Sequence, residues 1–163
     1  MVDMHTNLGP VDLRLIVSVP RSGSTLLMSL LSQSAYLGVT SRNVLMGNME
    51  TRVDRSVKRS FEPDYRVFTD VTHPVYNEGS KRNKKLIVSK EEYGNDRFTG
   101  NEELNECNYQ IIPEDSFFPV VNPFFLIRKP VDVFNSWVTL GWNDLPSFIL
   151  SYKTIIDMMK KAE

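Results

Sequence analysis

The feature that most constrains the fold is an apolar run followed by a small-residue loop and a leucine-rich stretch. Residues 13–19 read LRLIVSV and stop at Pro20, a pattern that predicts a buried strand. Residues 20–24 read PRSGS, which is typical of a turn. A helix is predicted from about Thr25, with an apolar side made of Leu26, Leu27, Leu30 and Leu31. A strand, a loop and a helix in this order open an α/β unit, so we expect an α/β fold.

Later parts of the chain predict more elements of the same kind. Apolar runs predict strands over residues 65–68 and 86–89, and a buried parallel strand over residues 124–127. Pro130 suits the first turn of a helix, and a last helix is expected within residues 144–163. Because no internal repeat or low-complexity segment divides the 163 residues, we expect a single domain over the whole chain.

Charge and composition argue against several classes of function. The chain has 19 basic and 20 acidic residues, and its formal net charge of −1 argues against nucleic-acid binding through bulk charge. One cysteine, Cys107, permits no internal disulfide, and two histidines, His5 and His73, argue against a His-rich metal site. No apolar run approaches the ~20 residues that span a bilayer, and the first residues lack a signal-peptide pattern. We therefore expect a cytoplasmic protein without a metal ion, a nucleic-acid partner or a membrane partner, and its oligomeric state stays open.

The loop after the first strand has the features of an anion site. Such a loop gathers free backbone N–H groups at a helix N-terminus, where the helix dipole also attracts negative charge. Gly23 permits close approach of the backbone, and Arg21 adds a positive charge. Hydroxyl donors come from Ser22, Ser24 and Thr25. A nucleotide-hydrolysing P-loop has a lysine after its second glycine, where this chain has Ser24, so the loop suits a shorter anion than a triphosphate with magnesium.

A second motif lies far along the chain, at another predicted strand–helix junction. Residues 125–137 read FLIRKPVDVFNSW, in which Arg128 ends the expected strand and Ser136 follows eight residues later. Arg128 can donate a forked pair of hydrogen bonds to a phosphate, and the hydroxyl of Ser136 can donate to the same group. Together with PRSGSTLL at residues 20–27, this segment resembles the two donor-binding motifs of sulfotransferases.

In sulfotransferases the first motif binds the 5′-phosphosulfate of 3′-phosphoadenosine 5′-phosphosulfate, and the second binds its 3′-phosphate. The resemblance implies a three-layer, P-loop-like parallel sheet flanked by helices, with both donor-binding motifs within residues 10–140. Three or four strands are few for such a sheet, so we expect a minimal form or one truncated at the C-terminus. The implied donor contacts are Arg21, Ser22, Gly23, Ser24, Thr25, Leu26, Arg128 and Ser136. The segments SKEE at residues 89–92 and LIRKP at residues 126–130 most resemble the corresponding segments of fungal sulfotransferase-like proteins.

The sequence offers several candidates for the catalytic base, the group that takes the proton from the acceptor's hydroxyl or amine. Many sulfotransferases carry Lys-x-His after a central strand, and here Lys90 matches the lysine while Glu92 stands in place of the histidine. Other sulfotransferases use a glutamate, so Glu92 is the first candidate base, and Lys90 is a candidate to neutralise the leaving phosphate. Neighbouring residues of a strand point opposite ways, so only one of Glu91 and Glu92 is expected to face the site. Glu50, in a Glu-Thr-Arg segment that resembles tyrosylprotein sulfotransferases, is a further candidate beside Glu91.

The resemblance implies transfer of a sulfuryl group from this donor to a hydroxyl or amine of a small-molecule acceptor. Two alternatives stay open. The absence of the usual histidine favours a catalytically inactive nucleotide-binding module. A P-loop phosphotransferase is the third reading, which the missing loop lysine opposes.

Overall fold

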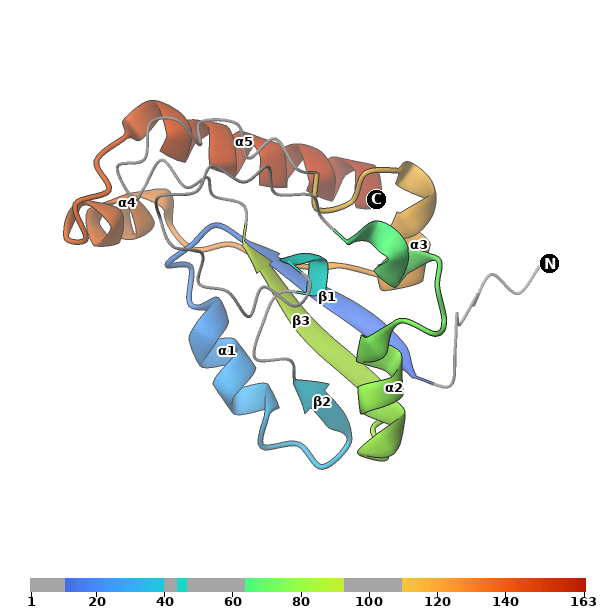
Figure 1. Cartoon of the computed structure of the whole chain (residues 1–163). Coiled ribbons are helices and arrows are strands. Elements are labelled where there is room, and N and C mark those ends of the chain that lie inside the picture. Colours follow the sequence, from blue (N-terminus) through green and yellow to red (C-terminus); the bar gives the residue numbers. More distant parts are fainter. Residues whose placement is uncertain (1–10, 40–43, 47–63, 93–109) are drawn as a thin grey trace, which may run out of the picture.

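The protein, described here from a computed structural model, has an α/β fold whose sheet contains four parallel strands in the described part of the chain (Figure 1). The structure describes residues 11–39, 44–46, 64–92 and 110–163. Its elements in chain order are β1 (Asp12–Ser18), α1 (Ser24–Leu31), β2 (Leu37–Val39), η1 (Val44–Met46), η2 (Tyr65–Phe68), α2 (Pro74–Lys81), β3 (Leu86–Glu92), η5 (Asp115–Phe117), α3 (Phe118–Val121), β4 (Phe124–Leu126), α4 (Pro130–Val138) and α5 (Leu145–Ala162). The strand order is β2-β3-β1-β4. The expected α/β class with a parallel sheet is confirmed.

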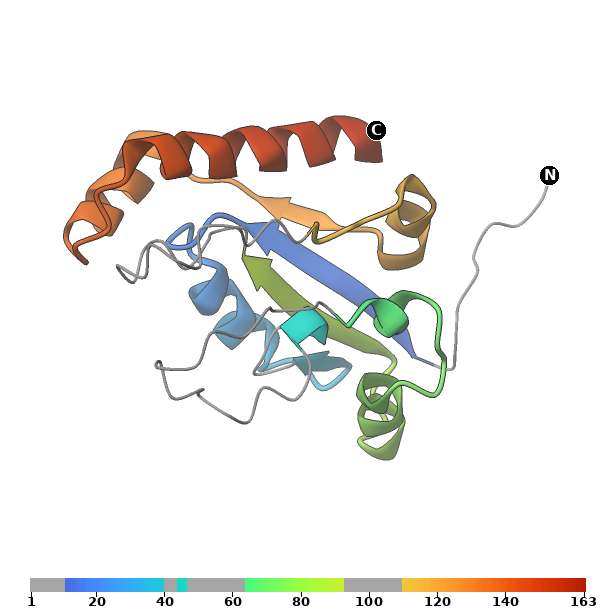
Figure 2. The same cartoon turned by 45° about the horizontal axis from the view of Figure 1, so that its top comes forward.

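The carboxyl ends of three neighbouring strands lie side by side. Ser18, the last residue of β1, pairs with Glu92 at the end of β3 and with Leu126 at the end of β4. Parallel strands point in one direction, so the segments that follow them leave from the same edge of the sheet. Figure 2 shows β4 next to β1, with α1 and α4 both beginning near this edge.

Two hydrophobic clusters cover opposite faces of the sheet, because alternate residues of a strand point to opposite faces. Ile16 of β1 and Val88 of β3 pack against Met28 of α1. On the other face β1 contributes Leu13, Leu15 and Val17 to a larger cluster with α2, α3, α4 and α5. The helical members of that cluster include Tyr76, Val121, Val133, Trp137, Phe148, Tyr152 and Ile155. In Figure 2 α1 and α5 accordingly lie on opposite sides of the sheet.

Two of the strand predictions need correction. Residues 65–68 form the 3₁₀-helix η2 rather than a strand, because the Asp64 carboxylate accepts a hydrogen bond from the Arg66 backbone N–H at 3.3 Å and caps a helical turn. A segment of four residues, of which Arg66 is charged, is too short to distinguish the two structures by its period. β4 is parallel as expected, but it is the edge strand of the described sheet and is not fully buried, since Phe124 is 57% exposed.

The helices begin close to the expected positions, but the apolar side of α1 is partly wrong. α4 begins at Pro130 and α5 begins at Leu145, as the sequence suggests. In α1 Leu26 and Leu30 are exposed, while Met28 is the apolar residue that is buried. Leucines at four positions of an eight-residue helix cover more than one face, so their spacing does not select the face that meets the sheet. No helix in the described ranges is both long enough and apolar enough to cross a bilayer.

Candidate functional site

A pocket of about 360 Å³ lies at the edge where β1, β3 and β4 end. Its walls come from three segments that are distant in the sequence. The lining residues are Pro20, Arg21, Gly23, Ser24 and Thr25 after β1, Glu92 at the end of β3, and Arg128, Ser136 and Trp142 after β4. The two motifs singled out in the sequence therefore open onto one pocket. They meet because β1 and β4 are parallel neighbours, so their following segments share an edge.

The loop after β1 is a tight turn with two residues at positive φ. The Ser22 backbone N–H donates to the Val19 carbonyl at 3.2 Å, with Pro20 and Arg21 in the centre of the turn. Arg21 has a φ of 74°, the left-handed conformation that a type II turn requires at this position and that usually calls for glycine. Holding a residue other than glycine there costs on the order of 1 kcal/mol. Strain of this kind concentrates at ligand sites, which favours a binding role for the Arg21 side chain.

Gly23 leads the loop into α1. Its φ of 101° favours glycine, although a Cβ would meet no atom within 4 Å, so the backbone conformation rather than lack of space selects this residue. No side chain caps the N-terminus of α1. The first backbone N–H groups of α1 are therefore available to an anion in the pocket, together with the positive end of the helix dipole.

A side-chain hydrogen bond joins the two motifs directly. Arg21 Nε donates to Ser136 Oγ at 3.0 Å, across 115 residues of sequence. Arg128, at the carboxyl end of β4, lines the same pocket. Two guanidinium groups and a hydroxyl thus line one pocket, and this set of donors suits a phosphate or sulfate group.

Two aromatic residues donate hydrogen bonds to the backbone of residues that line the pocket. Trp137 of α4 is fully buried, and its Nε1–H donates to the Pro20 carbonyl at 2.8 Å. The Tyr152 hydroxyl of α5 donates to the Arg128 carbonyl at 2.9 Å. Burial raises the pKa of Tyr152, so its hydroxyl remains protonated and able to donate. The loop after β1 is therefore hydrogen-bonded to α4, and the segment after β4 is hydrogen-bonded to α5.

Lys90 and Glu92 lie on the face of the sheet that α1 covers. Ser24 Oγ donates to Glu92 Oε1 at 2.5 Å, and Lys90 Nζ lies 3.2 Å from the same oxygen. Lys90 Nζ also donates to Thr25 Oγ1 at 3.0 Å. A carboxylate and an ammonium group from β3 therefore contact the first two residues of α1. Glu92 lines the pocket, whereas Lys90 does not line it and reaches two lining residues, Thr25 and Glu92.

Glu91 points to the opposite face and does not line the pocket. Its side chain is fully buried, and Oε1 accepts hydrogen bonds from the Leu45 backbone N–H at 3.4 Å and the Ser89 hydroxyl at 3.3 Å. Oε2 has no hydrogen-bond partner in the described part of the chain. Burial raises the pKa of Glu91 to about 8, so the carboxyl is largely protonated at neutral pH. The prediction that only one of Glu91 and Glu92 faces the site agrees with this arrangement.

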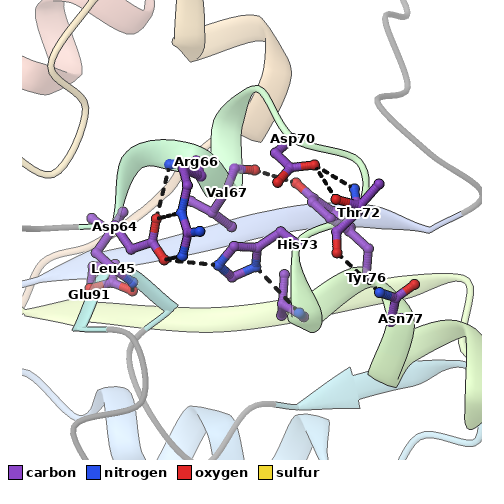
Figure 3. A network of polar contacts seen from close by, with 11 residues as sticks. Leu45, Asp64, Arg66, Val67, Asp70, Thr72, His73, Tyr76, Asn77 and Glu91 are labelled. Carbon is purple, nitrogen blue, oxygen red and sulfur yellow. Dashed lines mark hydrogen bonds and ion pairs between the residues drawn. The ribbon is translucent and has the colours of Figure 1, made fainter.

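Figure 3 shows Glu91 and Leu45 beside a polar network built on Asp64. The Asp64 carboxylate accepts a hydrogen bond from the Arg66 guanidinium and lies 3.4 Å from His73 Nε2. The hydrogen bond from Arg66 is the main cause that lowers the pKa of Asp64 to about 2. His73 Nδ1 in turn accepts from the Val75 backbone N–H at 3.3 Å and caps α2. This network fastens η2 to α2 and lies apart from the pocket lining.

The remaining candidates take different positions. Ser22 is buried within the loop, whereas Leu26 is 66% exposed on α1 and does not line the pocket. Glu50 lies outside the described residues. Trp142, which the sequence analysis did not include among the site residues, packs edge-on against Trp137 at 5.9 Å between ring centroids and also lines the pocket. Its position after a turn at Gly141, with a φ of 80°, gave no pattern that would reveal this second role.

Comparison with known proteins adds no relative: no protein-family model, curated protein or solved structure matches this chain. The chemistry of the pocket is therefore what bears on function. It offers two arginines, three hydroxyls and an uncapped helix N-terminus around one carboxylate, and Lys90 contacts two of the lining residues. Such a set can bind a ligand with two anionic groups and can move a proton at Glu92.

Proposed function

We propose that this protein is a sulfotransferase that uses 3′-phosphoadenosine 5′-phosphosulfate and acts on a hydroxyl or amine of a small-molecule acceptor. The proposal includes a three-layer, P-loop-like arrangement, with α1 on one face of the sheet and the larger helical cluster on the other. A cytoplasmic location and a reaction without a metal ion belong to the same proposal.

The observation that carries the proposal is the meeting of the two motifs in one pocket. The sequence resemblance requires a 5′-phosphosulfate loop and a 3′-phosphate pair to face a single ligand. Arg21 of the first motif donates to Ser136 of the second at 3.0 Å, and Arg128 lines the same pocket. The pocket volume of about 360 Å³ lies within the usual range for small-molecule sites, about 300–1,000 Å³.

The geometry supports an in-line transfer with separate roles for the side chains. The acceptor oxygen or nitrogen attacks sulfur, a new bond to sulfur forms, and the bond from sulfur to the bridging oxygen breaks. The electron pair of the broken bond leaves with the 5′-phosphate, and the proton of the acceptor passes to the Glu92 carboxylate. Lys90 and the N–H groups of α1 stabilise the negative charge on the leaving phosphate. Arg128 and Ser136 hold the 3′-phosphate and so position the donor.

Arg128→Ala is expected to weaken binding of 3′-phosphoadenosine 5′-phosphate by about 1.5–3 kcal/mol, a loss of roughly 10- to 100-fold. A charged hydrogen-bonding partner of a phosphate contributes about this much. Isothermal titration calorimetry of the parent and the variant measures the loss directly.

Lys129→Ala is the matched control, because Lys129 is the adjacent exposed cation and does not line the pocket. Its affinity for the bisphosphate should stay within about twofold of the parent. Equal affinities for the parent and Arg128→Ala would remove Arg128 from the site.

A P-loop phosphotransferase is the second candidate, and one contact favours it. Glu92 at the end of β3 accepts from Ser24 at the start of α1, and nucleotide-hydrolysing P-loop proteins hold magnesium between a loop hydroxyl and a nearby acidic residue. Against it, the loop has no lysine in the position that contacts the β- and γ-phosphates. Tight binding of ATP with magnesium, without binding of 3′-phosphoadenosine 5′-phosphate, would support this candidate over the first.

A further inference from the structure

The Glu92 carboxylate contacts the Ser24 hydroxyl and the Lys90 ammonium group, two donors that an anion bound in the loop would also use. The carboxylate accepts the Ser24 hydroxyl at 2.5 Å and lies 3.2 Å from Lys90 Nζ, through the same oxygen, Oε1. Ser24 is only 2% exposed and the Glu92 side chain is 26% exposed, so the contact is largely removed from water. The negatively charged carboxylate thus lies at the start of α1, where a bound anion would lie.

The Ser24 hydroxyl cannot serve the carboxylate and a ligand at the same time. A serine hydroxyl carries one proton and donates one hydrogen bond. Lys90 differs, because an ammonium group has three donors and can contact Thr25, Glu92 and a ligand together. Competition between Glu92 and a ligand therefore centres on the single proton of Ser24.

In the described part of the chain, the charged groups near Glu92 are three cations and one carboxyl. Lys90 comes from the same strand, while Arg21 and Arg128 line the pocket from the loop after β1 and the end of β4. Helix α1, which packs over this face, carries no charged residue in its sequence STLLMSLL. Glu91 is the neighbouring carboxyl, and it points to the opposite face of the sheet.

We propose that Glu92 is an internal competitor of the sulfuryl donor, and that donor binding displaces its carboxylate from Ser24 and so frees it to accept the proton of the acceptor. The inference rests on the proposed function. Before the donor binds, Oε1 of the carboxylate is held by Ser24 and Lys90. After displacement the Ser24 hydroxyl donates to the 5′-phosphosulfate. In this scheme proton transfer from the acceptor to Glu92 follows donor binding.

Glu92→Gln is expected to bind 3′-phosphoadenosine 5′-phosphate and inorganic sulfate about tenfold more tightly than the parent. The amide keeps the shape of the side chain but is a much weaker acceptor than the carboxylate, so Ser24 is released at lower cost. Titration calorimetry with both probes measures the change. Glu114→Gln, which removes an exposed carboxylate outside the pocket lining, is the control and should bind like the parent.

A double-mutant cycle separates competition for Ser24 from simple charge repulsion. In a Ser24→Ala background the hydroxyl is absent, so the gain from Glu92→Gln should fall below about twofold if the two residues are coupled. A gain that persists unchanged in that background overturns the inference, and so does a Glu92→Gln variant that binds no tighter than the parent. Both of those results leave the proposed function intact when the parent binds the bisphosphate. Failure of the parent and of Glu92→Gln to bind it contradicts the proposed function itself.

Discussion

The free energy of unfolding of this protein is expected to fall by several kcal/mol as the pH rises from 4.5 to about 8, and Glu91→Gln is expected to abolish that fall. In the folded protein burial raises the pKa of Glu91 from 4.5 to about 8, because the charged form would lose its hydration. The unfolded chain releases this proton near its ordinary pKa, so the folded state binds more protons between the two values. Stability from this group is complete below about pH 4.5 and is lost as the pH rises through the folded pKa, at roughly 1.4 kcal/mol for each pH unit.

The measurement is urea unfolding of the parent and Glu91→Gln at several pH values across this window. Glutamine is neutral throughout and can still accept from the Leu45 backbone N–H and the Ser89 hydroxyl, so the variant should keep its stability near pH 8. Glu114→Gln, an exposed carboxyl, should show the same slope as the parent. Asp64, whose pKa is lowered to about 2, contributes stability that is lost only as the pH falls below its ordinary value of 3.8, so it acts outside this window. Equal slopes for the parent and Glu91→Gln would contradict the account of Glu91.

Trp137→Ala is expected to destabilise the protein by about 3–5 kcal/mol, the usual cost of removing a buried aromatic side chain. Trp137 is fully buried and packs edge-on against Phe148, with ring centroids 4.9 Å apart. Its indole also donates to the Pro20 carbonyl at 2.8 Å, which is the contact that ties the loop after β1 to α4. Urea unfolding of the variant and the parent at one pH measures the loss.

Trp137→Phe separates the packing of this side chain from its hydrogen bond. Phenylalanine keeps an aromatic ring but cannot donate to Pro20, so a smaller loss of about 1–2 kcal/mol is expected. The same variant should bind 3′-phosphoadenosine 5′-phosphate more weakly than the parent, because the loop after β1 loses its hydrogen bond to α4. For the stability measurement alone the control is Trp142→Phe, since Trp142 is only partly buried and its substitution should cost less stability. A loss below about 1 kcal/mol for Trp137→Ala would contradict the view that this residue anchors the pocket.

The sequence was sufficient to predict the sheet edge at which the pocket lies. Apolar runs predicted the strands at residues 13–19 and 86–89, and the order of strand, loop and helix indicated an α/β fold with a parallel sheet. The structure adds the strand order: β1 lies between β3 and β4, so the residues after these strands share an edge and Arg21, Glu92 and Arg128 line one pocket. Both motifs could be recognised from their own residues, without any prediction for the chain between them.

Other parts of the fold depend on contacts that no local pattern contains. β2 has three residues, too few to show alternation. α2 has few apolar residues, and its start depends on the His73 ring, which accepts from the Val75 backbone N–H. The same limit applies within the site, because the hydrogen bond between Ser24 and Glu92 joins residues 68 positions apart in the sequence.

The most direct test of the central claim is a crystal structure of the protein with 3′-phosphoadenosine 5′-phosphate. The account predicts the 5′-phosphate at the N-terminus of α1, within about 3 Å of backbone N–H groups after Gly23. It predicts the 3′-phosphate within hydrogen-bond distance of Arg128 and Ser136, with the Glu92 carboxylate moved away from Ser24. A structure in which the nucleotide binds elsewhere, or in which only one of the two motifs contacts it, would contradict the account.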